Sequence, residues 1–188
     1  MDIVSLIKSD RAGGAQRLVA EYGNRLYETA IRLCGNTADA EDYAFRTLER
    51  AIARIGSFKE SSSFFTWLYE ILVNLIRSDK RRKAANALEF TDELPELVDP
   101  RPRPTEELIV QEEAEAVRAS LAELPLPLRE IIVFRYWEDL TVPEIAQILK
   151  IPEGTVKSRL FLAKNRVRAS VSRTIESHHA SNSKEEES

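Results

Sequence analysis

The chain of 188 residues, 43% of them hydrophobic, is long enough for one globular domain or two small ones. Its single cysteine, Cys34, excludes an internal disulfide and a cysteine-rich metal site, and its apolar neighbours predict a buried, unreactive thiol. The net charge of −4 hides strong segregation: residues 77–83 carry +4 and residues 150–173 carry +6, whereas residues 89–115 carry −8. The two basic segments therefore remain candidates for contact with nucleic acid.

Other classes of function find little support in the sequence. The only histidines, His178 and His179, lie together without further ligands nearby, so we expect neither a metal site nor a cofactor. The sequence shows no paired catalytic groups and no glycine-rich phosphate loop, so we do not expect an enzyme. It also shows no secretory signal and no apolar run of membrane-spanning length, which predicts a cytoplasmic protein without membrane insertion.

Helical periodicity dominates the first part of the chain. Apolar residues at helical spacing predict a helix over residues 18–33 that ends near Gly35. Asn36 or Thr37 is then expected to cap a second helix that runs to about Ile55. Strand signals are scarce throughout, so the first half of the chain is predicted to be all-helical.

A serine-rich loop at residues 57–63 leads into a third predicted helix over residues 64–83. The periodicity then fails, and residues 86–104 contain four of the eight prolines together with many acids. This composition is typical of a flexible, acidic connector. The connector predicts a boundary between two domains.

Helical periodicity returns at Thr105, is interrupted by the proline-containing turn at residues 124–127, and resumes over residues 128–137. We therefore predict an all-α fold of two small helical domains joined by a flexible acidic linker, the second with a helix-turn-helix. The predicted segments are a first domain at residues 1–85, the linker at 86–104, a second domain at 105–173 and a disordered tail at 174–188.

The helix-turn-helix is predicted within residues 141–168. Thr141 and Glu144 form a capping box at the start of its first helix, and residues 151–154 interrupt the helical pattern. From Thr155 onward, apolar residues at i, i+4, i+7 and i+11 give one buried stripe with cations on both flanks. A helix of this kind suits the DNA major groove, whose walls are phosphates, although a solvated basic face is the alternative. The residues expected to contact duplex DNA are Thr155, Lys157, Ser158, Arg159, Phe161, Lys164, Asn165 and Arg168.

A second nucleic-acid signal lies in the first domain. Residues 64–69 are rich in aromatic side chains, and the basic segment at residues 77–83 follows about three helical turns later. Aromatic rings beside a basic track are typical of proteins that bind unpaired DNA, because bases stack on the rings while cations follow the backbone. Two alternatives remain open: individual rings such as Phe64 belong to the core, and the cations form a solvated helix end.

Both halves of the chain, in this order, resemble an extracytoplasmic-function sigma factor of bacterial RNA polymerase. In the first half, the resemblance depends on residues 22–27, 39–42, 62–64, 66–69 and 74–75 with the arginine cluster after them. In the second half, it depends on Leu124-Pro125, Arg129-Glu130, Arg135-Tyr136, Glu144-Ile145-Ala146 and residues 152–160. The second pattern alone is shared with other regulators, but the two together, with an acidic tether between them, are highly specific.

The resemblance implies a protein that binds core RNA polymerase and directs it to promoter DNA. The second domain would read the upstream promoter element as duplex, and the first would open the downstream element and capture unpaired bases of the non-template strand. In the family, the loop matching residues 57–63 holds an extruded base. The residues implied for the downstream element and its melting are Lys59, Ser61, Ser62, Ser63, Trp67, Asn74, Arg77, Lys80, Arg81 and Arg82.

The resemblance also implies a docking helix for polymerase and a further candidate partner, an anti-sigma factor. The residues implied for contact with the largest polymerase subunit are Asp39, Glu41, Asp42, Phe45, Arg46 and Glu49. The acidic connector would thread toward the RNA-exit region of polymerase.

Several residues depart from the family pattern. Phe45 and Arg46 stand where the family usually has a glutamine and then an acid. In the loop, Glu60 and Ser61 replace a small-then-acidic pair, so the preferred extruded base does not follow from the sequence. In addition, Phe65 replaces a frequent arginine and Ser78 a frequent aspartate. These departures indicate an atypical subgroup with its own promoter sequence.

Two other classes of protein share part of this pattern. A response regulator shares the second-domain helix, but its receiver half would alternate strands and helices, and residues 1–85 show no such alternation. An all-helical adaptor, whose basic runs are only solvated faces, would show no salt-sensitive binding to DNA.

Overall fold

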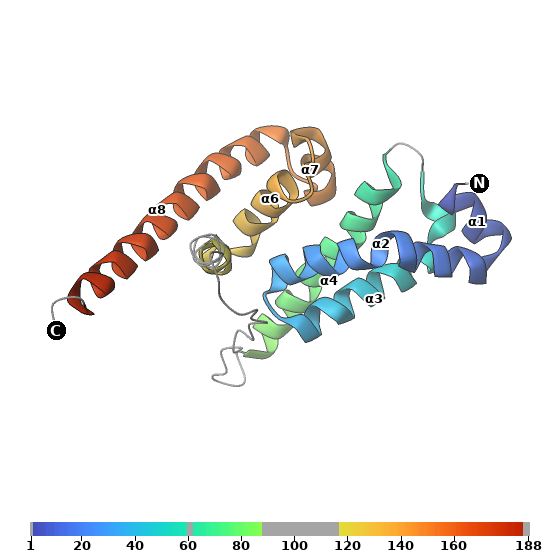
Figure 1. Cartoon of the computed structure of the whole chain (residues 1–188). Helices are drawn as coiled ribbons and strands as arrows, with labels where there is room; N and C mark the ends of the chain where they lie inside the picture. Colours follow the sequence, from blue (N-terminus) through green and yellow to red (C-terminus); the bar gives the residue numbers. More distant parts are fainter. Residues whose placement is uncertain (1, 60–61, 88–116, 186–188) are drawn as a thin grey trace. The chain divides into compact units, whose positions relative to one another are not determined.

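The structure is a computed structural model that describes residues 2–59, 62–87 and 117–185, with side chains described as far as residues 85 and 173 in the last two segments. All regular secondary structure in these segments is helical, which confirms the predicted all-α class (Figure 1). Nearly all of the predicted connector lies outside the described residues, and so does Ser61. The proposed boundaries of the connector therefore stay a prediction.

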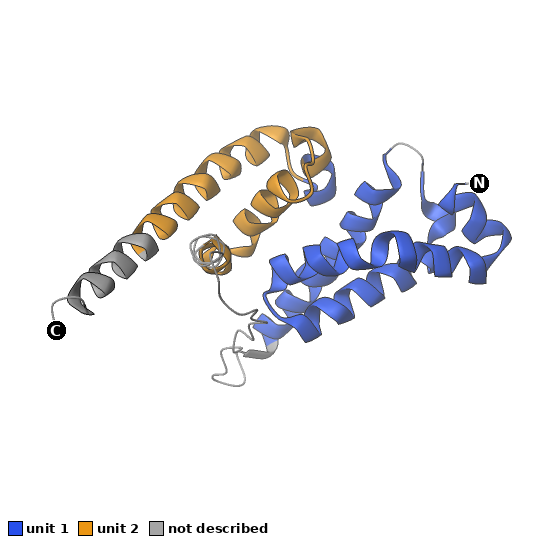
Figure 2. Ribbon diagram, viewed as in Figure 1, with its two compact units in different colours: residues 1–98, 146–150 blue, residues 99–145, 151–188 orange. Residues whose placement is uncertain are grey.

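The chain divides into two compact units (Figure 2). One comprises residues 1–98 with 146–150, and the other residues 99–145 with 151–188. The division passes through α7 (Val142–Leu149), the first helix of the helix-turn-helix. Each unit is described separately below.

Unit 1 consists of α1 (Ile3–Ser9), α2 (Arg11–Cys34), α3 (Thr37–Ala53), the short 3-10 helix η1 (Ile55–Ser57) and α4 (Phe64–Ala87). The long helices α2, α3 and α4 lie side by side, and α1 packs across the beginning of α2 (Figure 1). Apolar positions at helical spacing turn toward one another because burying them removes their surface from water. The fully buried core side chains include Leu18, Leu26, Leu33, Ala40, Ala51, Leu68, Tyr69 and Leu72.

The ends of these helices follow from local chemistry. Gly35 ends α2 in the left-handed region (φ 76°), where a glycine carries no Cβ penalty, and its N–H donates to the Ile31 carbonyl at 2.8 Å. Asn36 then caps α3, because its side-chain oxygen accepts a hydrogen bond from the Asp39 N–H at 2.9 Å. The predicted boundary between the first two helices is thus confirmed.

Helix α1 was not predicted. Asp2 caps it by accepting a 2.9 Å hydrogen bond from the Ser5 N–H, and its apolar residues Ile3, Val4 and Ile7 are buried. Helix α1 comes so close to α2 that a Cβ atom at Gly14 would lie 2.6 Å from the Ile7 Cα. With seven residues, α1 is too short to be found from its periodicity. Its stability comes from packing against α2 at Gly14 rather than from its own sequence.

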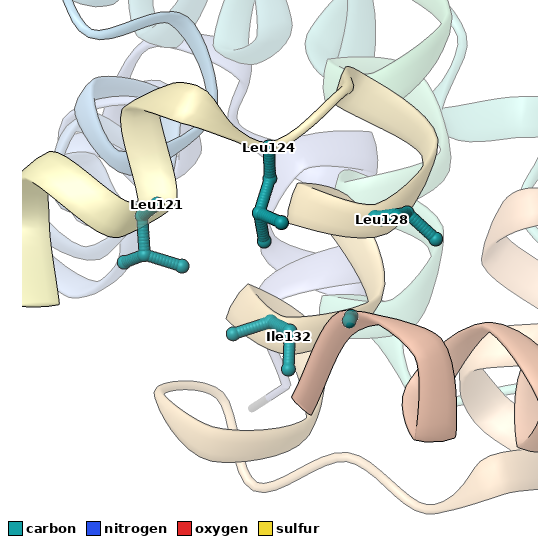
Figure 3. Close-up of a cluster of buried hydrophobic side chains, with 5 residues drawn as sticks. Leu121, Leu124, Leu128 and Ile132 are labelled. Atoms are coloured by element: carbon teal, nitrogen blue, oxygen red, sulfur yellow. The ribbon is translucent and has the colours of Figure 1, made fainter. Parts of the chain in front are cut away.

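Unit 2 is built from helical residues 117–123, α6 (Leu126–Tyr136), the beginning of α7 as far as Ile145, and α8 (Glu153–Glu185). Helix α6 begins at Leu126, whereas the sequence predicted a turn at residues 124–127 and a helix from residue 128. Pro127 lies in the first turn of α6, where the N–H that proline lacks would have no partner within the helix. A buried cluster joins residues 117–124, α6 and α8 (Figure 3), and its members are Leu121, Leu124, Leu128, Ile132 and Ala163.

Helix α8 is longer than predicted. It continues to Glu185, well beyond residue 168 and through most of the segment expected to be a disordered tail. The sequence contains no glycine or proline after Gly154, so nothing in it breaks the helix. The low hydrophobicity that predicted disorder does not itself end a helix.

Candidate nucleic-acid interface

The second helix of the helix-turn-helix is oriented by its apolar stripe. Val156 and Ala163 on α8 are fully buried, and Val167 packs against the cluster shown in Figure 3. The opposite face of α8 is therefore exposed along residues 155–168, a length of roughly 20 Å at 1.5 Å per residue. The predicted DNA-contacting residues on this face are exposed at Lys157, Ser158, Phe161, Lys164, Asn165 and Arg168, and partly exposed at Thr155 and Arg159.

The turn that presents α8 differs from the predicted one. The capping box at the start of α7 is present: the Thr141 N–H donates to Glu144 Oε2 at 2.8 Å, and the Glu144 N–H donates to Thr141 Oγ1 at 3.4 Å. However, the chain reverses at Lys150, whose φ is 54°, whereas Gly154 already belongs to α8. A lysine in the left-handed region is uncommon. The sequence prediction placed the turn at residues 151–154 because of its proline and glycine, and so it missed the turn at Lys150.

Apolar side chains interrupt the polar face of α8. Phe161 is 72% exposed and Leu162 is 45% exposed, although both are large hydrophobic residues. Exposed aromatic and aliphatic groups beside cations are able to contact the methyl group of thymine in a major groove, a contact that polar side chains do not make well. This face therefore offers cations for phosphates together with polar and apolar groups for base edges.

In unit 1, six aromatic rings form a continuous cluster around the beginning of α4. Phe64 lies 5.3 Å from Phe58, 5.5 Å from Tyr22 and 5.6 Å from Trp67, measured between ring centroids. Phe65 joins the cluster through Tyr22 and through the buried Tyr69, at 5.5 and 4.4 Å. All rings except Tyr69 are partly exposed, so the cluster serves the core and still presents ring faces to solvent.

An open cavity of about 420 Å³ lies beside this cluster. Its lining combines rings, from Tyr22, Phe58 and Phe64, with polar side chains, among them Ser62 and the Arg17–Glu21 ion pair. Ring faces and hydrogen-bonding groups in one cavity are the combination that holds an unstacked base. The predicted loop residue Ser62 is thus part of a cavity, and the rest of its lining comes largely from α1 and α2.

The neighbouring serine has a structural role. Ser63 Oγ accepts a 3.0 Å hydrogen bond from the Thr66 N–H and lies 2.8 Å from the Thr66 hydroxyl, so it caps α4. Lys59 is exposed at the other side of the loop. Of the predicted loop residues, Ser61 lies outside the described part of the chain.

The basic half of α4 presents polar and charged side chains to solvent. Asn74, Lys80, Arg81 and Arg82 are exposed, and Arg77 is partly exposed. These side chains belong to the same helix that begins with Phe64 and Trp67. A single rigid element therefore carries the aromatic cluster at one end and the cations along the other.

Helix α3 presents the predicted polymerase-docking residues in two ways. Glu41, Asp42 and Glu49 are exposed, and Phe45 among them is 62% exposed. Asp39 is partly exposed and accepts an ion pair from Lys83 at 3.2 Å. Arg46, in contrast, turns its guanidinium toward α4 and pairs with Asp79 at 2.8 Å.

Sequence patterns missed contacts between different helices. The Arg25 guanidinium carbon lies 4.0 Å from the centre of the Phe65 ring, a cation–π contact between α2 and α4. Phe65 is the residue named above as a departure from the family pattern, and Arg25 brings a cation to its ring. Only the departure itself signalled that this position was unusual.

Comparison with known proteins gives these surfaces a context. Residues 18–86 match the family model described as Sigma-70 region 2, and residues 114–167 match the one described as Sigma-70, region 4. The ECF RNA polymerase sigma factor SigW of Bacillus subtilis (strain 168) is 30% identical over 159 residues, which cover 80% of this chain and 85% of the relative. The chain belongs to the extracytoplasmic-function (ECF) sigma factors.

Other relatives agree. The ECF sigma factor EcfG of Rhodopseudomonas palustris (strain TIE-1) is 34% identical over 140 residues, covering 74% of this chain and 75% of the relative. Among solved structures, the sigma factor RpoE of Bartonella quintana, in complex with the anti-sigma factor NepR, has a TM-score of 0.72 and 26% identity, covering 84% of this chain and 96% of that one.

This sigma factor is accordingly a transcription initiation factor, of a family that binds core RNA polymerase and promoter DNA and whose members are regulatory proteins rather than enzymes. In the described segments, no helix combines the length and the hydrophobicity that crossing a bilayer requires.

Proposed function

We propose that the exposed face of α8 reads the upstream promoter element as duplex DNA. Its cations lie on both flanks, as phosphate contacts on both walls of a groove require, and its polar and apolar residues lie between them. Val156 and Ala163 fix the rotation of the helix, so this face is presented without rearrangement. Lys157 and Arg159 are the cations chosen to test it.

We further propose that unit 1 separates the strands of the downstream element. The observation that carries this proposal is the arrangement on α4: Trp67 and its neighbouring rings stand at the beginning of the helix, and the cations from Arg77 to Lys83 follow about 15 Å later at 1.5 Å per residue. Unpaired bases would stack on the rings, and one would enter the cavity beside Ser62. The cations would hold the backbone at the junction with duplex.

The exposed face of α3 is proposed to dock on core polymerase. Glu41, Asp42 and Glu49 surround Phe45, and an exposed aromatic residue within an acidic rim is typical of an interface anchor. A relative of known structure was solved with an anti-sigma factor. A protein of that kind that covered this face would compete with polymerase for it.

The test uses holoenzyme assembled from core polymerase and the full chain, on a promoter defined by mapping transcript starts after overexpression. Lys157→Ala and Arg159→Ala are expected to weaken binding to the upstream duplex by roughly tenfold, the scale of a lost base or phosphate contact. Trp67→Ala and Arg81→Ala are expected to spare polymerase binding and upstream contact, but to reduce the permanganate reactivity of unpaired thymines.

Two exposed cations serve as matched controls. Arg118→Ala in unit 2 and Lys8→Ala in unit 1 remove the same charge away from the proposed surfaces and should leave both measurements unchanged. If the control variants weakened DNA binding as much as the test variants, the effect would come from total charge, and the assignment of α8 and α4 would be wrong.

A further inference from the structure

Arg46 connects two helices through a pair of acids. Its Nη1 donates to Asp42 Oδ2 on α3 at 2.7 Å and to Asp79 Oδ2 on α4 at 2.8 Å. The guanidinium carbon also lies 5.9 Å from the centre of the Tyr43 ring. Arg46 is therefore held from both sides, and its side chain is only 27% exposed.

Asp79 is the unusual member of this group. It is the only acid within the basic segment 77–83, and it is 8% exposed. A carboxylate so far removed from water is costly unless a cation is paired with it, and the hydrogen bond from Arg46 holds the pKa of Asp79 below its ordinary value. The charge of Asp79 is thus kept, and Arg46 is its short-range partner.

The other cations near Asp79 are positioned for a different use. Arg82 lies 3.5 Å from Asp79 Oδ1, but its side chain is 70% exposed. Lys83 is paired with Asp39 at 3.2 Å, and its side chain is 65% exposed. Exposed ion pairs of this kind contribute little to stability. The side chains of Arg82 and Lys83 can therefore turn outward as long as Arg46 neutralises the carboxylate of Asp79.

We propose that Arg46 is a positioning residue for promoter opening: by neutralising Asp79, it keeps Arg82 available for DNA phosphate. This inference rests on the proposed role of α4. Arg82 already makes an exposed contact with Asp79 at 3.5 Å; without Arg46 it would become the main cation partner of this carboxylate, and the basic surface would lose a cation.

This role differs from direct contact with polymerase. The neighbouring Phe45 projects into solvent at 62% exposure, whereas Arg46 is engaged across the helix pair. Phe45 is therefore the docking residue of the two, and Arg46 acts on DNA through α4. The two roles predict opposite patterns in variants.

The experiment compares Arg46→Gln, Arg46→Lys, Asp79→Asn and the double variant R46Q/D79N, each in the full chain assembled with core polymerase on the mapped promoter. We expect Arg46→Gln to retain polymerase affinity, to reduce the open complex on the order of fivefold, as one uncompensated charge does, and to lower the salt slope of DNA binding by about one. The double variant should recover both measurements, because Asp79→Asn removes the charge that captures Arg82. Arg46→Lys, which keeps the cation, should recover part of the loss.

Thermal unfolding, followed by Trp67 fluorescence in the Trp137→Phe background, separates this role from a purely structural one. If the role of Arg46 were only structural, promoter opening would follow the stability of unit 1 across all four variants. The inference is overturned if promoter opening follows stability across the variants, or if Arg46→Gln opens the promoter normally. It is also overturned if Arg46→Gln loses polymerase affinity and the double variant R46Q/D79N does not restore promoter opening. Arg82→Ala distinguishes the two proposals. If Arg82→Ala and Arg81→Ala both open the promoter normally, the role of α4 itself is wrong; if Arg82→Ala impairs opening while Arg46→Gln does not, only the role of Arg46 is wrong.

Discussion

Gly14 is the residue at which α1 meets α2, and the backbone there leaves no room for a side chain. A Cβ at this position would lie 2.6 Å from the Ile7 Cα and 2.7 Å from the Ile7 N, and neither backbone atom moves without moving α1. We expect Gly14→Ala to lower the free energy of unfolding of unit 1 by about 1–3 kcal/mol, the usual cost of overpacking. The measurement is thermal unfolding followed by Trp67 fluorescence, with Trp137→Phe as the background.

Gly23 in the same helix provides the matched control. A Cβ at Gly23 would meet only Val19 Cγ1, at an ordinary contact distance of 3.6 Å. Alanine has the higher helix propensity, so Gly23→Ala should stabilise unit 1 by about 0.5–1 kcal/mol. If both substitutions stabilised unit 1, helix propensity would outweigh the contact with α1, and the predicted overpacking at Gly14 would be wrong.

At the scale of the element, the capping box of α7 makes unit 2 sensitive to acid. Hydrogen bonds from the Thr141 hydroxyl and N–H hold the pKa of Glu144 below its ordinary value of 4.5. A carboxyl whose pKa is lowered by folding adds stability that is complete above about pH 4.5 and is lost as the pH falls through the lowered value. We expect Thr141→Ala to cost about 1 kcal/mol at pH 7 and less at pH 3.

Trp137 fluorescence in a Trp67→Phe background measures this effect in unit 2. Ser172→Ala, at an exposed position of α8, is the control and should not lower stability at either pH. A cost of Thr141→Ala that was the same at pH 3 and pH 7 would show that Glu144 does not contribute through its charge.

The elements that the sequence predicted are those whose limits are set locally. Gly35, Asn36 and the Thr141–Glu144 pair act on their own helices, so their effects could be predicted from neighbouring residues. Helix α1 was missed because its stability depends on packing at Gly14. The pairing of Arg46 with Asp79 was missed because helical periodicity tells which face of a helix is polar but not which residue of another helix it meets.

At the scale of the whole molecule, the charges of this sigma factor oppose each other. The net charge is −4, although residues 150–173 carry +6 and residues 77–83 carry +4, because residues 89–115 contain ten acids against two arginines. At low ionic strength, charges act over distances of about 30 Å, so these acids repel DNA from the whole chain. We therefore expect the free sigma factor to bind promoter duplex weakly, and holoenzyme to bind it tightly.

The triple variant Glu93→Gln, Glu96→Gln, Glu107→Gln tests this view, because it raises the net charge from −4 to −1 without changing either unit's proposed DNA surface. The affinity of the free chain for duplex should rise by roughly tenfold at 0.01 M salt, and the gain should disappear near 1 M, where the Debye length falls to about 3 Å. Aspartate at the same three positions keeps the charge and should give no gain. Tight binding by the unmodified free chain would show that it is not kept from DNA at all. An equal gain with aspartate would mean that something other than acidic repulsion keeps this sigma factor from DNA until polymerase binds it.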